Sequence, residues 1–182
     1  MKRIIVLCTL IGLFGGTVSA RTEISFGPKF GLNVTNCTRS HMNARTGVQL
    51  GALSNIRFND YIALQPEILL SMQGCRKNDV VCKYNYFHIP VMAKAYLYKG
   101  LNLGFGPQFG LLADPRIRDK KAKTTRHPDN MNPFDFSLGF GVGYETGIGF
   151  LVDTRYNIST TKLTGSSRSR NSVLALTIGW KF

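Results

Sequence analysis

The stretch LNLGFGPQFGLL, residues 101–112, alternates between two kinds of side chain. Every odd position from Leu101 to Leu111 is apolar, whereas the even positions carry asparagine, glutamine or glycine until Leu112. A period of two places successive side chains on opposite faces of a β-strand. The stretch therefore predicts a strand with one apolar face and one small or polar face, and the open question is which face meets water.

The same period recurs along the chain. The other segments that show it are 22–33, 46–58, 61–73, 85–97, 134–145, 149–159 and 171–182. Together with the opening stretch they predict eight strands and no helix. The connections differ in length: Asn59-Asp60, Lys99-Gly100 and a turn near Gly147 are tight, whereas about 34–45, 74–83, 114–133 and 160–170 are long. Because neighbouring antiparallel strands reverse direction, all short turns fall at one end and all long loops at the other.

Two architectures accommodate this pattern. A soluble barrel or sandwich, such as a ligand-binding barrel, turns its apolar face inward, whereas a membrane barrel turns it toward lipid. Strands of 11 to 13 residues match the roughly 9–11 tilted residues that cross a bilayer. The other face carries glycine and charge in mid-strand, which suits a narrow lumen. Its members are Gly104, Gly106, Gly139, Gly141, Gly143, Lys29, Arg57, Glu67, Lys94, Asp153 and Arg155.

Aromatic residues on the apolar face gather near the strand ends, as in the two interfacial girdles of membrane barrels. They are Phe58, Tyr144, Phe150, Trp180 and Phe182 at the short-turn end and Phe87, Phe134 and Phe136 at the other. The fold class expected is all-β, an eight-stranded antiparallel up-and-down transmembrane β-barrel whose last strand pairs with the first, because lipid leaves no partner for an open sheet edge. Pro66 and Pro107 each remove a ladder donor, so we expect a β-bulge at each.

Residues 1–20 read as a secretory signal peptide, with a basic start, an apolar run over 4–16 and small residues before a cleavage site ahead of Arg21. A retained membrane anchor is the alternative, but the apolar run is shorter than the ~20 residues of a spanning helix. The barrel domain is then 21–182. Removal of Lys2 and Arg3 leaves 21 basic and 10 acidic residues, a net charge of +11. Anionic lipid or acidic glycan fits an exported basic protein better than nucleic acid does.

Cys37, Cys75 and Cys82 lie in the mature chain. Cys75 and Cys82 bracket a short connection, so they are the preferred disulfide in an oxidising compartment, with Cys37 bridged to either of them as the alternative. Zinc binding is the weaker reading, because no histidine lies nearby at ligand spacing. We expect no metal and no cofactor.

The inward face balances charge, with five basic and five acidic residues. They are Lys29, Arg57, Lys94, Arg155 and Lys181 against Glu23, Glu67, Asp135, Glu145 and Asp153. Buried charges need partners, so these side chains either plug the lumen as ion pairs or line a narrow, gated ion path. We expect the plug. The candidate central charge cluster is Glu67, Lys94 and Arg155, with Asp153 and Arg57 beside it.

The long connections hold 14 basic and 4 acidic residues, nearly all of the excess charge. The densest run is in 114–133, and it consists of Arg116, Arg118, Lys120, Lys121, Lys123 and Arg126. A solvated loop surface explains this charge, and contact with phosphate or carboxylate groups of lipopolysaccharide is the more specific alternative.

Several segments, in order, resemble PorT-like outer-membrane β-barrel proteins of the Bacteroidetes type. They are GPKFGLN (27–33), LQPEILLSMQG (64–74), YNYFHIPVMAKAYL (84–97), GFGPQFGLL (104–112), DFSLGFGVGYE (135–145), DTRYN (153–157) and RNSVLALTIGWKF (170–182). The resemblance implies a small barrel similar in architecture to OmpA and OmpX, in the bacterial outer membrane. It also implies that the terminal Phe182 is read by the barrel-assembly machinery. The family's name comes from a member tied to protein secretion.

Function is less determined than fold. His41, His88 and His127 are scattered and form no constellation of nucleophile, base and orienting group, so we expect no catalytic residues and no enzyme. The sequence favours a monomeric barrel with a closed lumen and a structural or surface-interaction role. The alternatives are a narrow channel, a secretion-accessory barrel and, least favoured, a lipid-modifying barrel enzyme.

Overall fold

The computed structural model describes residues 22–38, 43–77, 80–119, 121, 124–126, 132–161 and 170–182. All of its regular elements are strands, and no helix in this part of the chain is long and apolar enough to cross a membrane. The strands are β1 Glu23–Thr38, β2 Asn43–Arg57, β3 Ile62–Lys77, β4 Val80–Tyr98, β5 Leu101–Asp119, β6 Thr124–Arg126, β7 Phe134–Glu145, β8 Phe150–Ser159 and β9 Arg170–Trp180. The predicted signal peptide, residues 1–20, lies outside the described residues, and the first strand, β1, begins at Glu23, inside the predicted barrel domain 21–182.

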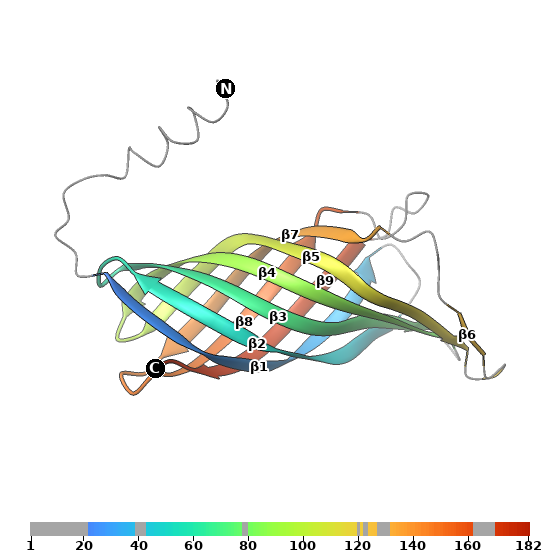
Figure 1. Ribbon diagram of the computed structural model, residues 1–182, viewed down its shortest axis with the longest axis horizontal. Helices are drawn as coiled ribbons and strands as arrows, with labels where there is room; N and C mark the ends of the chain where they lie inside the picture. Colours follow the sequence, from blue (N-terminus) through green and yellow to red (C-terminus); the bar gives the residue numbers. More distant parts are fainter. Residues whose placement is uncertain are drawn as a thin grey trace, which may run out of the picture.

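Eight long antiparallel strands close into a barrel, which confirms the predicted fold class (Figure 1). Each long strand pairs with its neighbours in sequence, and β5 pairs with β7. The first and last strands, β1 and β9, pair from Lys29 opposite Gly179 to Thr38 opposite Arg170. This pairing satisfies the edge that would otherwise be exposed to lipid.

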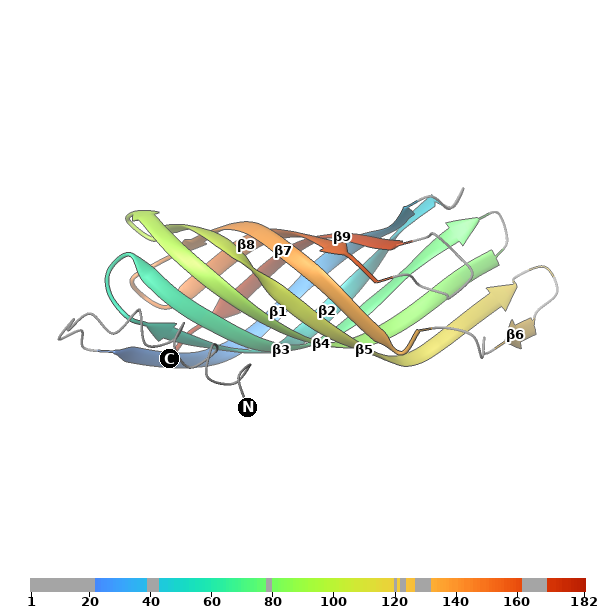
Figure 2. The same ribbon diagram turned by 90° about the horizontal axis from the view of Figure 1, so that it is seen from above.

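The strands β3, β4 and β5 extend together past β7, whose first residue, Phe134, lies opposite Leu111. Segments 74–83 and 114–119, which the sequence assigned to loops, are largely strand, so that Arg116 and Arg118 belong to β5. The short strand β6 adds to β5 alone, at the far end of this projection (Figure 2). The loop prediction was wrong here because backbone pairing needs no apolar alternation, and only the part of a strand that faces lipid carries that signal.

The three short connections are tight turns at one end of the barrel, as predicted. Lys99 and Gly100 both have positive φ, 41° and 91°, which is the backbone of a two-residue hairpin turn that matches strand twist. The C-terminus lies at this end (Figure 1), where the Phe182 amide donates to the Phe26 carbonyl at 2.8 Å.

The predicted bulges at the two prolines do not form. Register is constant from Ile62 opposite Ala95 to Lys77 opposite Val80 around Pro66, and without interruption through Pro107 opposite Leu138. Each proline therefore costs the ladder a donor without displacing its neighbours. Register shifts occur elsewhere. They lie between Ala44 and Gln49, between Asn85 and Tyr86, and between Tyr96 and Tyr98.

Burial alternates along the strands and shows which face of each strand points into the barrel. In β8 the odd residues Leu151 to Ser159 are buried and the even ones are half-buried or exposed. The exposed set consists of the large apolar side chains, and the buried set is rich in charged and amide side chains. The barrel is thus apolar outside and polar inside, as a membrane barrel requires.

Candidate functional site

The middle of the lumen holds an ion-pair cluster built from three strands. Glu67 on β3 accepts from Lys29 on β1 at 2.9 Å and from both terminal nitrogens of Arg155 on β8, at 2.7 and 3.0 Å. Lys29 Nζ also lies 2.6 Å from a carboxylate oxygen of Asp153. Gln65 adds a further donor to Glu67 at 2.5 Å. We call Lys29, Glu67, Asp153 and Arg155 the central cluster.

The central cluster is fully enclosed, with the Glu67 side chain 0% exposed. Transfer of such charges out of water costs several kcal/mol for each ion. Mutual pairing and the fork of Arg155 on Glu67 offset that cost. The cluster thus closes the lumen through a set of interactions in which each charge depends on the others.

A second charged layer lies nearer the short turns. Glu145, the last residue of β7, accepts from Lys94 at 2.7 Å, from Lys181 at 2.5 Å and from the Tyr96 hydroxyl at 2.8 Å. Arg57 stacks over the Tyr96 ring, 4.1 Å from its centroid. We call Lys94, Glu145 and Lys181 the lower layer.

The structure groups these residues differently from the sequence prediction. Glu67, Arg155 and Asp153 do lie together, but Lys94 belongs to the lower layer and Arg57 to the rim beside Tyr96. Lys29 completes the central cluster, although the sequence marked it only as one of ten inward charges. The alternation of side chains along β1 could place Lys29 inside the lumen, but only the assembled barrel shows that Lys29 reaches Glu67 across β2.

The long-loop half of the lumen contains amides and a histidine instead of ion pairs. His88 lies between Gln73 and Gln108, whose amide nitrogens are 2.9 and 3.2 Å from its two ring nitrogens, and Tyr86 stacks on it at 5.2 Å between ring centroids. The contacts of His88 are therefore amides and an aromatic ring, not the hydroxyl or thiol that a nucleophile would supply. His41 and His127 lie outside the described residues.

The lumen is tightly filled. Two cavities inside it are each about 10 Å³, which is the space of a single water molecule. Inward glycines make room for long polar side chains: a Cβ at Gly139 would lie 2.6 Å from Asn157 Oδ1, and one at Gly143 would lie 2.8 Å from Asn102 Oδ1. Such packing supports the plugged lumen over an open path.

Cys75 and Cys82 lie directly opposite each other in the β3–β4 pair, and both are buried. Cys37 lies on β1, and β2 separates it from β3. Two strand spacings of about 4.8 Å exceed the ~7 Å reach of a disulfide between α-carbons, which argues against a Cys37–Cys75 bridge. The Cys75–Cys82 disulfide stays a prediction, and its geometry would need little backbone movement.

The predicted basic residues gather where the strands project. Arg116 on β5 and Lys121 have exposed side chains, and register places Arg116 opposite Lys83 and Arg118 opposite Val81. Arg126 lies on β6 opposite Ile117. Lys120 and Lys123 lie outside the described residues. Among the residues that the structure describes, no three histidine, cysteine, aspartate or glutamate side chains group as a metal site.

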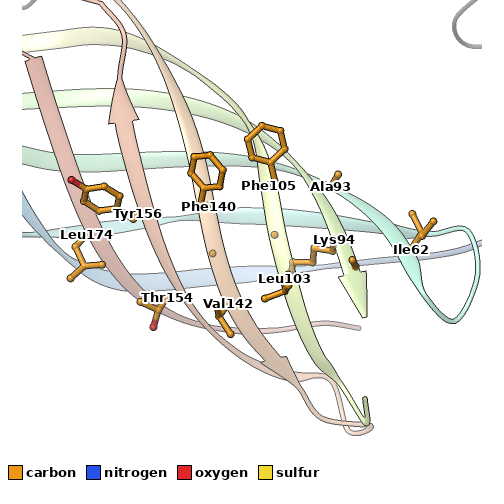
Figure 3. Close-up of a pocket in the computed structure, with 13 residues that line it drawn as sticks. Ile62, Ala93, Lys94, Leu103, Phe105, Phe140, Val142, Thr154, Tyr156 and Leu174 are labelled. Atoms are coloured by element: carbon orange, nitrogen blue, oxygen red, sulfur yellow. The ribbon is translucent and has the colours of Figure 1, made fainter. Parts of the chain in front are cut away.

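The outer face carries a wide, shallow hollow of about 780 Å³ across several strands (Figure 3). Its lining includes the small residues Ala93, Ala95 and Gly104. Phe105 and Phe140 lie side by side on neighbouring strands along it, with ring centroids 4.9 Å apart. Most of its lining residues are the exposed apolar side chains of the outer face.

Comparisons with known proteins agree with this geometry. The sequence profile described as "Outer membrane protein beta-barrel domain" matches residues 18–165. No curated protein matches the chain. Solved structures similar to it include Ail, the attachment invasion locus protein of Yersinia pestis, in complex with the heparin analogue sucrose octasulfate, at 14% identity and TM-score 0.55, covering 88% of this chain and 99% of that one.

Two further structures have the same fold. Neisserial surface protein A is 13% identical with TM-score 0.55, covering 87% of this chain and 97% of that one. OprG from Pseudomonas aeruginosa is 12% identical with TM-score 0.54, covering 91% and 99%. At such low identity these likenesses establish the fold alone.

Proposed function

Because the chain belongs to the outer membrane protein beta-barrel domain family and lies in the bacterial outer membrane, we propose that it is a non-conducting barrel whose working surface is its basic long-loop end. We place that end outside the cell and both termini in the periplasm, as short turns and long loops are arranged in related barrels. The observation that carries the proposal is the contrast between a lumen filled by paired charges and a projecting, positively charged sheet.

The ligand class that fits the projecting sheet is phosphate on lipopolysaccharide. Arginine binds phosphate through two parallel hydrogen bonds, and basic residues near a charged membrane surface each contribute roughly 1 kcal/mol. Arg116 and Lys121 are exposed at this end. The complex of Ail with a polysulfated sugar shows that this fold accommodates anionic ligands in another protein.

A lipopolysaccharide-binding measurement tests the proposal. The variant Arg116→Gln with Lys121→Gln should bind purified lipopolysaccharide more weakly and with a shallower salt dependence. The control is Lys99→Asn, which removes one exposed basic charge at the opposite end and suits the positive φ of that turn. Unchanged binding in the double variant would contradict a basic binding surface.

Planar-bilayer conductance tests the closed lumen. We expect silence from protein whose folding is verified by the mobility difference between unheated and boiled samples on a gel. Discrete openings that respond to Glu67→Gln or Lys94→Gln would instead support the narrow-channel alternative.

The finer family assignment is also a proposal. Segments such as DFSLGFGVGYE (135–145) resemble PorT-like barrels, which would suggest an accessory role in protein secretion. Secretion by a strain that lacks the gene, compared with one that carries it, separates this role from a purely structural one. Assembly through Phe182 is proposed on the same resemblance, and this residue is 82% exposed.

A further inference from the structure

We propose that the cavity at the long-loop end of the lumen binds one small, hard cation through the carboxylate of Asp135 and the side-chain oxygens of Ser137 and Asn157. All three residues line this cavity, together with His88, Gln73 and Gln108. The inference is independent of the surface role proposed above, because it concerns the interior of the barrel.

The first argument is the charge of Asp135. The residue is 8% exposed, and its partner is the hydroxyl of Ser159. Among the described residues no lysine, arginine or histidine forms a salt bridge with it, whereas Glu67, Glu145 and Asp153 all have such partners. A buried carboxylate is costly unless it is paired or coordinates a metal ion.

The second argument comes from two neutral oxygens in the same cavity. Ser137 Oγ and Asn157 Oδ1 are buried without a hydrogen-bond partner, and their residues are only 2% and 6% exposed. Orphaned buried polar atoms are rare in folded proteins and call for a partner. Together with Asp135 they place one carboxylate and two further oxygen lone-pair donors on a cavity that the amides of Gln73, Gln108 and Asn171 also line.

Size and donor type define the ligand. The cavity measures about 10 Å³, so it holds one water-sized occupant. Carboxylate, amide and hydroxyl oxygens are the donors that hard cations such as Ca²⁺ prefer. Na⁺ has the same donor preference, and competition between the two ions identifies the natural occupant.

One alternative uses no ion. Ser159 Oγ also lies 3.0 Å from the Thr161 carbonyl, and a hydroxyl has a single proton to donate. If Asp135 is neutral, its own O–H donates a hydrogen bond to Ser159 Oγ, and the Ser159 hydroxyl donates to the Thr161 carbonyl. In that case the carboxyl group carries no charge and the cavity holds at most a water molecule.

Tyrosine-sensitised terbium luminescence distinguishes these states, because Tb³⁺ replaces Ca²⁺ at oxygen sites and Tyr86 stacks directly on His88 at the cavity. The folded protein, purified in detergent and freed of lipopolysaccharide, should give a saturable signal that Ca²⁺ or Na⁺ displaces. Displacement at low Ca²⁺ assigns Ca²⁺ as the occupant, and displacement only by Na⁺ assigns Na⁺.

The decisive variant is Asp135→Asn, which keeps the side-chain shape and removes the charge. We expect an affinity loss of about tenfold or more, because mutation of even an outer-shell partner of a metal ligand typically costs roughly 10–100-fold in affinity. Asp60→Asn, in the exposed turn at the opposite end, is the control and should leave the signal unchanged. Ser137→Ala should weaken binding less than Asp135→Asn.

Two results would overturn the proposal. An unchanged signal in Asp135→Asn would mean that Tb³⁺ binds elsewhere on the surface. No saturable signal from the folded wild-type protein would mean that Asp135 is neutral and donates a hydrogen bond to Ser159. Gel mobility checks that each variant is folded, so that neither result can arise from misfolding.

Discussion

The two halves of the lumen differ in the partners that they provide for buried carboxylates. Toward the short turns, the carboxylates of Glu67, Asp153 and Glu145 each meet at least one cationic side chain. Toward the long loops, Asp135 meets a hydroxyl and the neighbouring groups are amides, hydroxyls and His88. In the first half each of these carboxylates therefore has an ionic partner, whereas Asp135 in the second half has none among the described residues.

Glu67→Gln should have the largest effect on stability. It leaves Lys29 and Arg155 buried with only Asp153 as an anionic partner, so the free energy of unfolding should fall by about 3–5 kcal/mol. Urea unfolding in lipid vesicles, followed by fluorescence of the single tryptophan, Trp180, measures it. A loss below about 1 kcal/mol would mean that the central cluster does not stabilise the barrel.

Glu145→Gln should cost less, about 1.5–3 kcal/mol, the scale of a hydrogen bond to a charged group. The Lys181 side chain is 13% exposed, so water reaches this end of the lumen and screens the cations left behind. The same unfolding assay compares the two variants. A larger loss than for Glu67→Gln would reverse the assignment of the central cluster as the main plug.

Gly110→Ala tests how closely the long-loop half is packed. A Cβ there would lie 2.8 Å from the His88 ring and 3.3 Å from the Asp135 Cβ, and such overpacking costs typically about 1–3 kcal/mol. Gly147→Ala is the matched control, since its Cβ would meet nothing within 4 Å. Equal stability of the two variants would show that the long-loop half of the lumen has room for an added methyl group beside His88.

Asp135→Asn should have the smallest effect in buffer without added cation, less than about 1 kcal/mol. Asparagine retains an acceptor for Ser159 and removes a charge that has no ionic partner, so little is lost. Thermal unfolding of this variant beside Glu67→Gln measures the contrast between the halves. A loss as large as that of Glu67→Gln would place a cationic partner at Asp135.

Much of the barrel wall follows from the sequence. Alternation along 101–112 and seven other segments predicted the long strands, their inward and outward faces and the end that carries the tight turns, and the structure confirms these predictions. The signal is strong because successive residues of each strand face lipid and the filled lumen in turn. Apolar and polar side chains must therefore alternate along the whole membrane-spanning part of the strand.

The prediction of strands failed beyond the part of the barrel wall in which apolar and polar residues alternate. The extensions of β3, β4 and β5 and the short strand β6 show no regular alternation of apolar and polar residues, so their sequences resemble loops. The expected bulges at Pro66 and Pro107 were wrong for a related reason, since local chemistry shows a missing donor but not whether the neighbouring strand can tolerate it.

By itself, the sequence determined which side chains enter the lumen, because side-chain direction is a local property of an extended backbone. Only the tertiary structure decided which of them meet. Lys29 reaches Glu67 from 38 positions away and Arg155 from 88, and those contacts depend on the stagger between strands when the sheet closes. The same closure brings Asp135, Ser137 and Asn157 to one cavity. The residues that line it come from several strands, so no single strand's pattern predicts it.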